Sequence, residues 1–181
     1  GRDGGPIDSM KSIALLRHAK SSWDNPALAD FDRPLSRRGE KAALRIGEEI
    51  RRRELRFDSV ISSPARRAVD TIRLVEEGYG EPFQIRFEPL LYDSPVSRLM
   101  KIVREVDDSV DRLLLVGHSP ELQESTLLFS ERDDPLLPAV EFKYPTGALA
   151  LLELPVTRWE DVALGSARIA AFIKPRDLKL E

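Results

Sequence analysis

The stretch Ile13-Ala14-Leu15-Leu16-Arg17-His18 decides the fold of this chain. Its first four residues are all apolar, and a run this short and uniform is typical of a strand buried on both faces of a parallel sheet. The two basic residues that follow would then stand at the carboxyl end of the strand, the edge at which α/β proteins bind ligands. The stretch therefore predicts an α/β fold with a candidate site at the end of its first strand.

Outward from this strand, short apolar runs alternate with amphipathic stretches. Further strands are predicted at residues 58–61, 83–87 and 113–116, and two more apolar stretches lie at 148–154 and 167–173. Helical patterns begin at Ser36, Ser63, Ser94 and Ser119, while the polar, proline-rich segment 131–145 is predicted to be a loop. The alternation predicts a single-domain three-layer sandwich, in which a mostly parallel central sheet carries helices on both faces.

Two of the helix starts carry local signals. Ser36 is predicted to be the N-cap of the first helix, and Gly39 in its first turn leaves room for a close approach of another backbone segment. Ser63 and Pro64 are predicted to be the N-cap and the first residue of the second helix.

Composition excludes several classes of protein. The chain has 181 residues, a formal net charge of −3 and no cysteine, so a disulfide scaffold, a thiolate nucleophile and a zinc finger are excluded. Nucleic-acid partners are not expected, because proteins that coat nucleic acids usually carry net positive charge. No stretch approaches the 18 or so consecutive apolar residues of a membrane span, so no membrane association is expected either.

The first nine residues are predicted to be a remnant of an expression vector, with Met10 as the native start and residues 10–181 as the folded domain. They show neither the basic region nor the apolar run of a signal peptide. Together with the lack of cysteine, this predicts a cytoplasmic protein.

Both histidines of the chain fall at predicted strand ends. His18 directly follows the first strand, and His118 follows the strand at 113–116 after one glycine. Arg17 adjoins His18, and Arg67 stands near the start of the second helix, where free backbone N–H groups already favour an anion. Because guanidinium donors match phosphate oxygens, the sequence predicts a pocket for a phosphoryl group.

A neutral imidazole can attack phosphorus near neutral pH, and a protonated second imidazole can stabilise charge on the phosphoryl oxygens. Metal binding is the poorer interpretation, because two histidines without HExxH spacing or a carboxylate cluster make a poor zinc site. No Walker-type or GxGxxG sequence occurs, so no cofactor and no metal are expected.

Four segments in this order, LLRHAKSSW, DFDRPLSRRGEKAA, ISSPARRAVDT and VGHSPEL, resemble the histidine phosphatase superfamily, branch 1. The lysine after RHA, the PTGA string and the closing PRDL resemble its SixA-type phosphohistidine phosphatases, and the resemblance covers residues 10–178. It implies a histidine phosphatase domain with a phosphoglycerate-mutase-like minimal core that lacks the helical insertions of larger members.

The resemblance implies roles for individual residues. His18 would be the phosphorylated nucleophile flanked by Arg17, Arg67 would occupy the arginine position of SPxxRA, and His118 would be the second active-site histidine. Ser21 would contact the phosphate, although an ordinary loop hydroxyl is an equal alternative.

Two nearby residues have different expectations. Arg66 is expected to be a solvated helix residue. The sequence departs from the family at the general acid, where Asp93 is the candidate and a plain carboxylate near a helix start is the alternative.

These observations predict a metal-independent hydrolase of phosphoric monoesters or phosphoramidates that forms a covalent phosphohistidine. By resemblance, its substrate would be phosphohistidine in a protein, such as a signalling or carrier domain. The alternatives are a phosphatase for a small phosphate ester or anhydride among metabolites, a mutase, and a phosphate-binding module without turnover. A mutase is disfavoured because the sequence shows no clear acid and no insertion that would close over a substrate.

Overall fold

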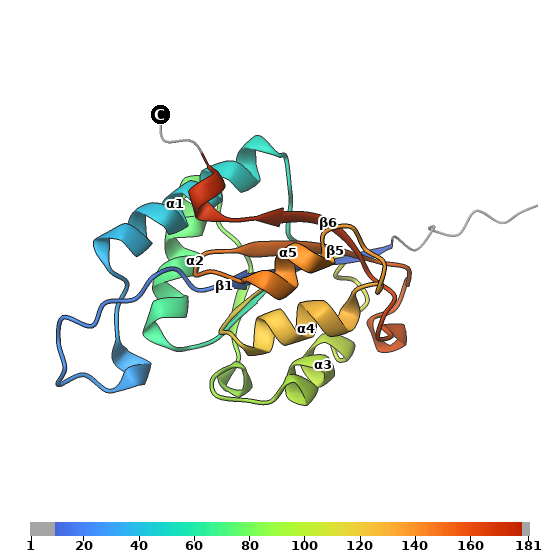
Figure 1. Ribbon diagram of the computed structural model, residues 1–181, viewed down its shortest axis with the longest axis horizontal. Helices are drawn as coiled ribbons and strands as arrows, with labels where there is room; N and C mark the ends of the chain where they lie inside the picture. The colour runs from blue at the N-terminus through green and yellow to red at the C-terminus, as the bar shows by residue number, and fades with distance from the viewer. Residues whose placement is uncertain (1–9, 179–181) are drawn as a thin grey trace, which may run out of the picture.

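The computed structural model describes residues 10–178, so the expectation for residues 1–9 lies outside the described residues. Figure 1 shows a central sheet between two layers of helices. The strands are β1 (Lys11–Arg17), β2 (Ser59–Ser62), β3 (Ile85–Phe87), β4 (Arg112–Gly117), β5 (Leu149–Leu154) and β6 (Arg168–Ile173). The helices are α1 (Arg37–Arg52), α2 (Arg66–Tyr79), α3 (Val96–Arg104), α4 (Glu121–Phe129) and α5 (Leu137–Phe142), with short 3-10 turns at Asp30–Asp32, Pro89–Leu91, Trp159–Asp161 and Pro175–Asp177.

The six strands form one sheet in the order β3-β2-β4-β1-β5-β6. β1, β2, β3 and β4 run parallel, with Leu15 of β1 opposite Leu115 of β4. β5 is antiparallel to both β1 and β6. The prediction of a mostly parallel sheet is confirmed, and the parallel half carries the carboxyl-end edge at which the candidate site was expected.

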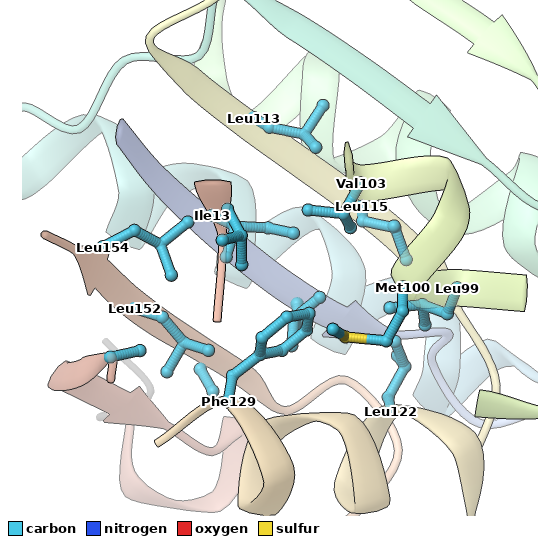
Figure 2. Close-up of a cluster of buried hydrophobic side chains, with 14 of the residues drawn as sticks. Ile13, Leu99, Met100, Val103, Leu113, Leu115, Leu122, Phe129, Leu152 and Leu154 are labelled. Carbon is cyan, nitrogen blue, oxygen red and sulfur yellow. The ribbon is translucent and has the colours of Figure 1, made fainter. Parts of the chain in front are cut away.

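Alternation along β1 divides the interior into two cores. Ile13 and Leu15 face α3, α4 and α5, while Ala14 and Leu16 face α1 and α2. Figure 2 shows the first of these cores, in which Phe129 of α4 packs beneath the sheet. Helices therefore cover both faces, as the three-layer prediction required.

The entry to α1 matches its sequence signals. The Ser36 hydroxyl accepts a hydrogen bond from the Gly39 N–H at 3.1 Å, so Ser36 is the N-cap. A Cβ on Gly39 would lie 2.0 Å from the carbonyl oxygen of Lys20. The missing side chain thus lets the segment after β1 pass directly against the first turn of α1.

Two local predictions are wrong. α2 begins at Arg66 with Ala65 as its N-cap, because the Ser63 hydroxyl bonds instead to the Ala65 N–H and to the ring of His118. The segment 131–145 is not all loop, because it contains the six-residue helix α5. Pro138 stands in the first turn of α5, where proline is tolerated. Among the described residues, no helix is long and apolar enough to cross a membrane.

Candidate active site

The carboxyl ends of β1, β2 and β4 bring the predicted site residues together. His18 directly follows β1, His118 directly follows β4, and Arg67 lies in the first turn of α2 after β2. The centroids of the two imidazole rings are 5.2 Å apart. Parallel neighbours in the sheet order β2-β4-β1 place these three loops side by side, so residues distant in sequence share one pocket.

The ring of His18 is held in a defined tautomer. Its Nδ1 lies 2.7 Å from the carbonyl oxygen of Ala19, and because a carbonyl only accepts, Nδ1 carries the proton. Nε2 is then left with its lone pair, and the Arg67 Nε donates to it at 3.4 Å. Burial, together with the charges of His118, Arg67 and Arg17, lowers the pKa of His18 to about 3, so the ring is neutral at pH 7.

His118 is held by a hydroxyl. Its Nε2 lies 2.8 Å from the Oγ of Ser63, the first residue after β2. Burial, and then the positive charge of Arg67, lowers the pKa of His118 to about 4. The second imidazole is therefore neutral at pH 7 in the free protein, and an entering phosphoryl dianion would raise its pKa.

Several polar atoms at this edge lack partners. Within the part of the chain that the structure describes, four buried side-chain N or O atoms make no hydrogen bond, and three of them are Arg17 Nε, His118 Nδ1 and Ser119 Oγ. Arg17 is otherwise fixed by its Nη1, which donates to the carbonyl oxygen of Tyr144 at 2.8 Å. Buried polar groups without partners are costly, and these three are of the kinds that hydrogen-bond to an oxyanion.

A hollow of about 290 Å³ opens beside His118 and Ser119, while His18 and Arg17 lie outside its lining. Its lining residues are Asp30, Arg67, Tyr92, Asp93, His118, Ser119 and Glu121. Its inner side is basic and buried at Arg67, and its outer side is acidic and partly exposed at Asp30. It has room for a phosphoryl group on a larger molecule, and the open wall leaves the rest of that molecule outside.

Sequence reasoning missed Asp30, Arg33 and Tyr92. Asp30 bonds to all of Arg33, Arg67 and Tyr92, at 3.0, 3.1 and 2.8 Å. These donors, the Tyr92 hydroxyl first, lower the pKa of Asp30 to about 2. Asp30 and Arg33 lie inside the DFDRPLSRR segment that carried part of the family resemblance, so a signal was present, whereas nothing in the sequence marked Tyr92.

The remaining sequence candidates fall in three different places. The Ser21 hydroxyl accepts from Arg33 Nη2 at 2.5 Å, so it reaches the pocket only through Arg33. Asp93 lines the hollow with a left-handed backbone, φ 53°. Arg66 is exposed and lies 3.5 Å from Asp70, as expected of a solvated helix residue.

The side chains of residues 10–178 contain no group of three or more His, Asp or Glu residues arranged to hold a metal ion. The pocket offers one neutral imidazole whose Nε2 lone pair accepts from Arg67, a second imidazole and buried guanidinium groups.

Comparisons with known proteins agree with this geometry. Residues 13–93 match the histidine phosphatase superfamily (branch 1). The uncharacterized protein Rv1276c of Mycobacterium tuberculosis is 32% identical over 164 residues, covering 89% of this chain and 100% of that protein.

Solved structures extend the agreement to more than nine tenths of the chain. SixA from Agrobacterium tumefaciens is 26% identical with a TM-score of 0.77, over 92% of this chain and 99% of that chain. SixA from Nakamurella multipartitia is 25% identical with a TM-score of 0.78, over 92% and 97%. A protein histidine phosphatase SixA complexed with tungstate shares the fold at 20% identity, over 93% and 99%, with a TM-score of 0.76. The matched segment contains the first three of the four motifs, the relative and the SixA structures cover about nine tenths of the chain, and the chain belongs to the histidine phosphatase superfamily, branch 1, as a member of the SixA type.

Proposed function

We propose that this protein is a metal-independent phosphatase that forms a covalent phosphohistidine on His18, and that its substrates are phosphohistidine side chains of other proteins. Membership of the superfamily and the SixA neighbours support phosphatase activity in general. The observation that carries the mechanism is the tautomer of His18, because a ring nitrogen without a proton is what attack on phosphorus requires.

Arg17, Arg67 and His118 would hold the three non-bridging oxygens of the substrate phosphoryl group. The unpartnered Arg17 Nε and His118 Nδ1 would supply two of the donors. The positive charge of the two arginines and the N–H groups of all three residues would stabilise charge on these oxygens as phosphorus moves toward His18.

In the first step, the Nε2 lone pair of His18 forms a bond to phosphorus while the bond from phosphorus to the leaving group breaks. The leaving group keeps that electron pair. In the second step, water forms a P–O bond, the N–P bond breaks, and its electrons return to Nε2. The water proton passes to solvent or to the released phosphate, so the enzyme returns to its starting state.

A leaving imidazole suits the pocket better than a leaving alkoxide. An imidazole that carries a proton on its other nitrogen leaves as a neutral molecule, whereas an alkoxide needs a proton from an acid. Asp93 is the candidate acid for an ester substrate, since it lines the hollow, while Asp30 is held ionised by its donors. The open hollow and the protein histidine phosphatase SixA of the same fold support a phosphorylated protein as substrate.

To test this proposal, a protein that carries phosphohistidine is incubated with the wild-type enzyme or with His18→Ala in the presence of excess chelator. Loss of the phosphohistidine signal is followed by ³¹P NMR. Wild type is expected to hydrolyse the phosphohistidine and His18→Ala to be inactive. Rapid quenching at alkaline pH should trap acid-labile phosphate on the wild type. Because the chain has two histidines, peptide mapping has two positions to distinguish, and the label is expected on Nε2 of His18. Turnover by His18→Ala would overturn the covalent mechanism.

Two alternatives remain as outcomes of the same test. Hydrolysis of small phosphate esters or anhydrides but not of phosphohistidine would assign a metabolite phosphatase. A protein that binds phosphate yet never acquires label would be a phosphate-binding module, for which a positioned nucleophilic tautomer has no use.

A further inference from the structure

The Asp30 side chain occupies an unusual position in this pocket. It lies on the short 3-10 turn Asp30–Asp32, on the segment between β1 and α1, and its side chain is 51% exposed. It nevertheless receives hydrogen bonds from Arg33, Arg67 and Tyr92. A half-exposed carboxylate with three donors is fixed more firmly than a surface aspartate usually is.

Arg67 presents two different edges to its surroundings. Its end-on edge is taken by Asp30, because Nη1 donates to the Asp30 carbonyl oxygen at 2.8 Å and Nη2 donates to Oδ2 at 3.1 Å. Its Nε edge faces the attacking nitrogen, with Nε 3.4 Å from His18 Nε2. A guanidinium has five N–H groups, so the Asp30 contacts leave the Nε proton and one proton on each Nη nitrogen for a ligand.

We propose that Asp30 is a positioning residue, which grips the end-on edge of Arg67 and so keeps the Nε edge turned toward the phosphoryl group that His18 attacks. This rests on the proposed function. Without Asp30, the long Arg67 side chain could rotate, and its donors would no longer converge on the same three oxygens.

Asp30 is itself held from a second direction. Arg33 is 6% exposed and donates to Asp30 Oδ1 at 3.0 Å and to the Ser22 carbonyl oxygen at 3.2 Å. Its guanidinium also lies over the Trp23 ring, 3.1 Å from the ring centroid. The segment after β1 thus holds Arg67 in place through Asp30, which accepts hydrogen bonds from the guanidinium groups of both Arg33 and Arg67.

If Asp30 competed with phosphate instead of positioning Arg67, its removal would change phosphate affinity in the opposite direction. A carboxylate beside a phosphate site can act as a competing anion, and its removal would then strengthen phosphate binding. Positioning predicts weaker binding after removal. The direction of the change in phosphate affinity therefore separates the two roles.

The experiment uses Asp30→Asn, with Asp32→Asn as matched control. Asp32 lies on the same turn, is exposed, and its side chain makes no hydrogen bond or ion pair in residues 10–178. Inorganic phosphate is titrated into each protein and followed by ³¹P NMR, and kcat and KM are measured with a phosphohistidine protein. We expect Asp30→Asn to raise the phosphate Kd about tenfold and to lower kcat/KM by more, with Asp32→Asn within about twofold of wild type.

A double-mutant cycle with Arg67→Ala tests whether Asp30 acts through Arg67. If it does, Asp30→Asn has no further effect on phosphate affinity in the Arg67→Ala background. An equal loss in both backgrounds, tighter phosphate binding by Asp30→Asn, or an equal loss in Asp32→Asn would each overturn the proposal. Because phosphate binding needs no turnover, failure of the proposed catalytic function would show separately, as wild type that binds phosphate and hydrolyses nothing.

Discussion

A contact with the Ser63 hydroxyl holds Nε2 of His118 and leaves Nδ1 as the ring nitrogen without a partner. When the hydroxyl donates to Nε2, the proton of neutral His118 lies on Nδ1, the buried atom without a partner. When His118 becomes protonated, the same hydroxyl can turn and accept. One rotatable O–H can therefore serve both charge states of His118 during turnover.

Ser63→Ala is expected to leave the His118 tautomer unspecified. Because Nδ1 of His118 would then carry its proton only part of the time, it would be a poorer donor to the phosphoryl oxygens, and kcat/KM should fall about tenfold. Ser62→Ala is the matched control, because Ser62 is the buried neighbour and donates only to the carbonyl oxygen of Ser63, at 3.0 Å. Each variant should lose about 1 kcal/mol of stability. Steady-state kinetics and ¹⁵N NMR of the imidazole measure both effects, and equal kinetics in the two variants would contradict this role.

At residue scale, the sequence predicted the groups that stand directly at strand ends and missed those that arrive through tertiary contacts. Arg17, His18 and His118 could be found because a polar residue at the end of a buried strand has a known place in an α/β fold, and Arg67 because it stands in the first turn of the helix that follows β2. Tyr92 meets Asp30 across 62 positions of chain, and no local pattern specifies that contact.

At the scale of elements, α1 and α2 are packed through reciprocal glycines. A Cβ on Gly47 of α1 would lie 2.1 Å from the carbonyl oxygen of Val75 in α2, and a Cβ on Gly78 of α2 would lie 2.1 Å from the carbonyl oxygen of Leu44 in α1. Both contacts are with backbone, which cannot move aside as a side chain could. The two helices therefore touch main chain to main chain, and α2 carries Arg67 in its first turn.

Gly47→Ala is expected to force these helices apart and to lower the free energy of unfolding by about 2 kcal/mol, even though alanine is the better helix former. Gly80→Ala is the control, because a Cβ there meets nothing within 4 Å and the cost of its φ of 88° alone is about 1 kcal/mol. Urea unfolding measures both. A Gly47→Ala protein no less stable than Gly80→Ala would show that the helices adjust without strain.

Sequence patterns predicted some helices and strands correctly and missed or misplaced others, for physical reasons. The apolar runs of β1 and β4 are unambiguous because both faces of these strands are buried, and Ser36 caps α1 as expected. α5 was missed because six residues that include Pro138 present too little periodicity to stand out from a proline-rich loop. The start of α2 was misplaced because the Ser63 hydroxyl, which looks like a cap, serves the active site instead.

At the scale of the whole molecule, a chain of net charge −3 gathers buried basic residues at one edge of its sheet. The two histidines are neutral there because burial opposes their protonation, and this has a consequence for stability. Their pKa values are about 3 and about 4 in the folded state, against about 6.5 in the unfolded chain. The unfolded chain therefore binds about one more proton than the folded protein at pH 6.5, and nearly two more at about pH 5.

Stability should accordingly be complete above about pH 6.5 and fall as the pH is lowered, by about 1.4 kcal/mol per pH unit for each histidine. Urea unfolding at pH 7.5, 6 and 5 is expected to show a combined loss of about 2.4 kcal/mol between pH 6 and pH 5. Because the chain contains two histidines, single replacements by asparagine should each halve this slope, and the double variant should be nearly flat down to pH 5. Asp30 and Glu49, whose pKa values are about 2 when folded, lose their contribution only at lower pH. A steep slope that survives in the double variant would place the sensitivity in other groups and show that the pocket does not hold its histidines neutral.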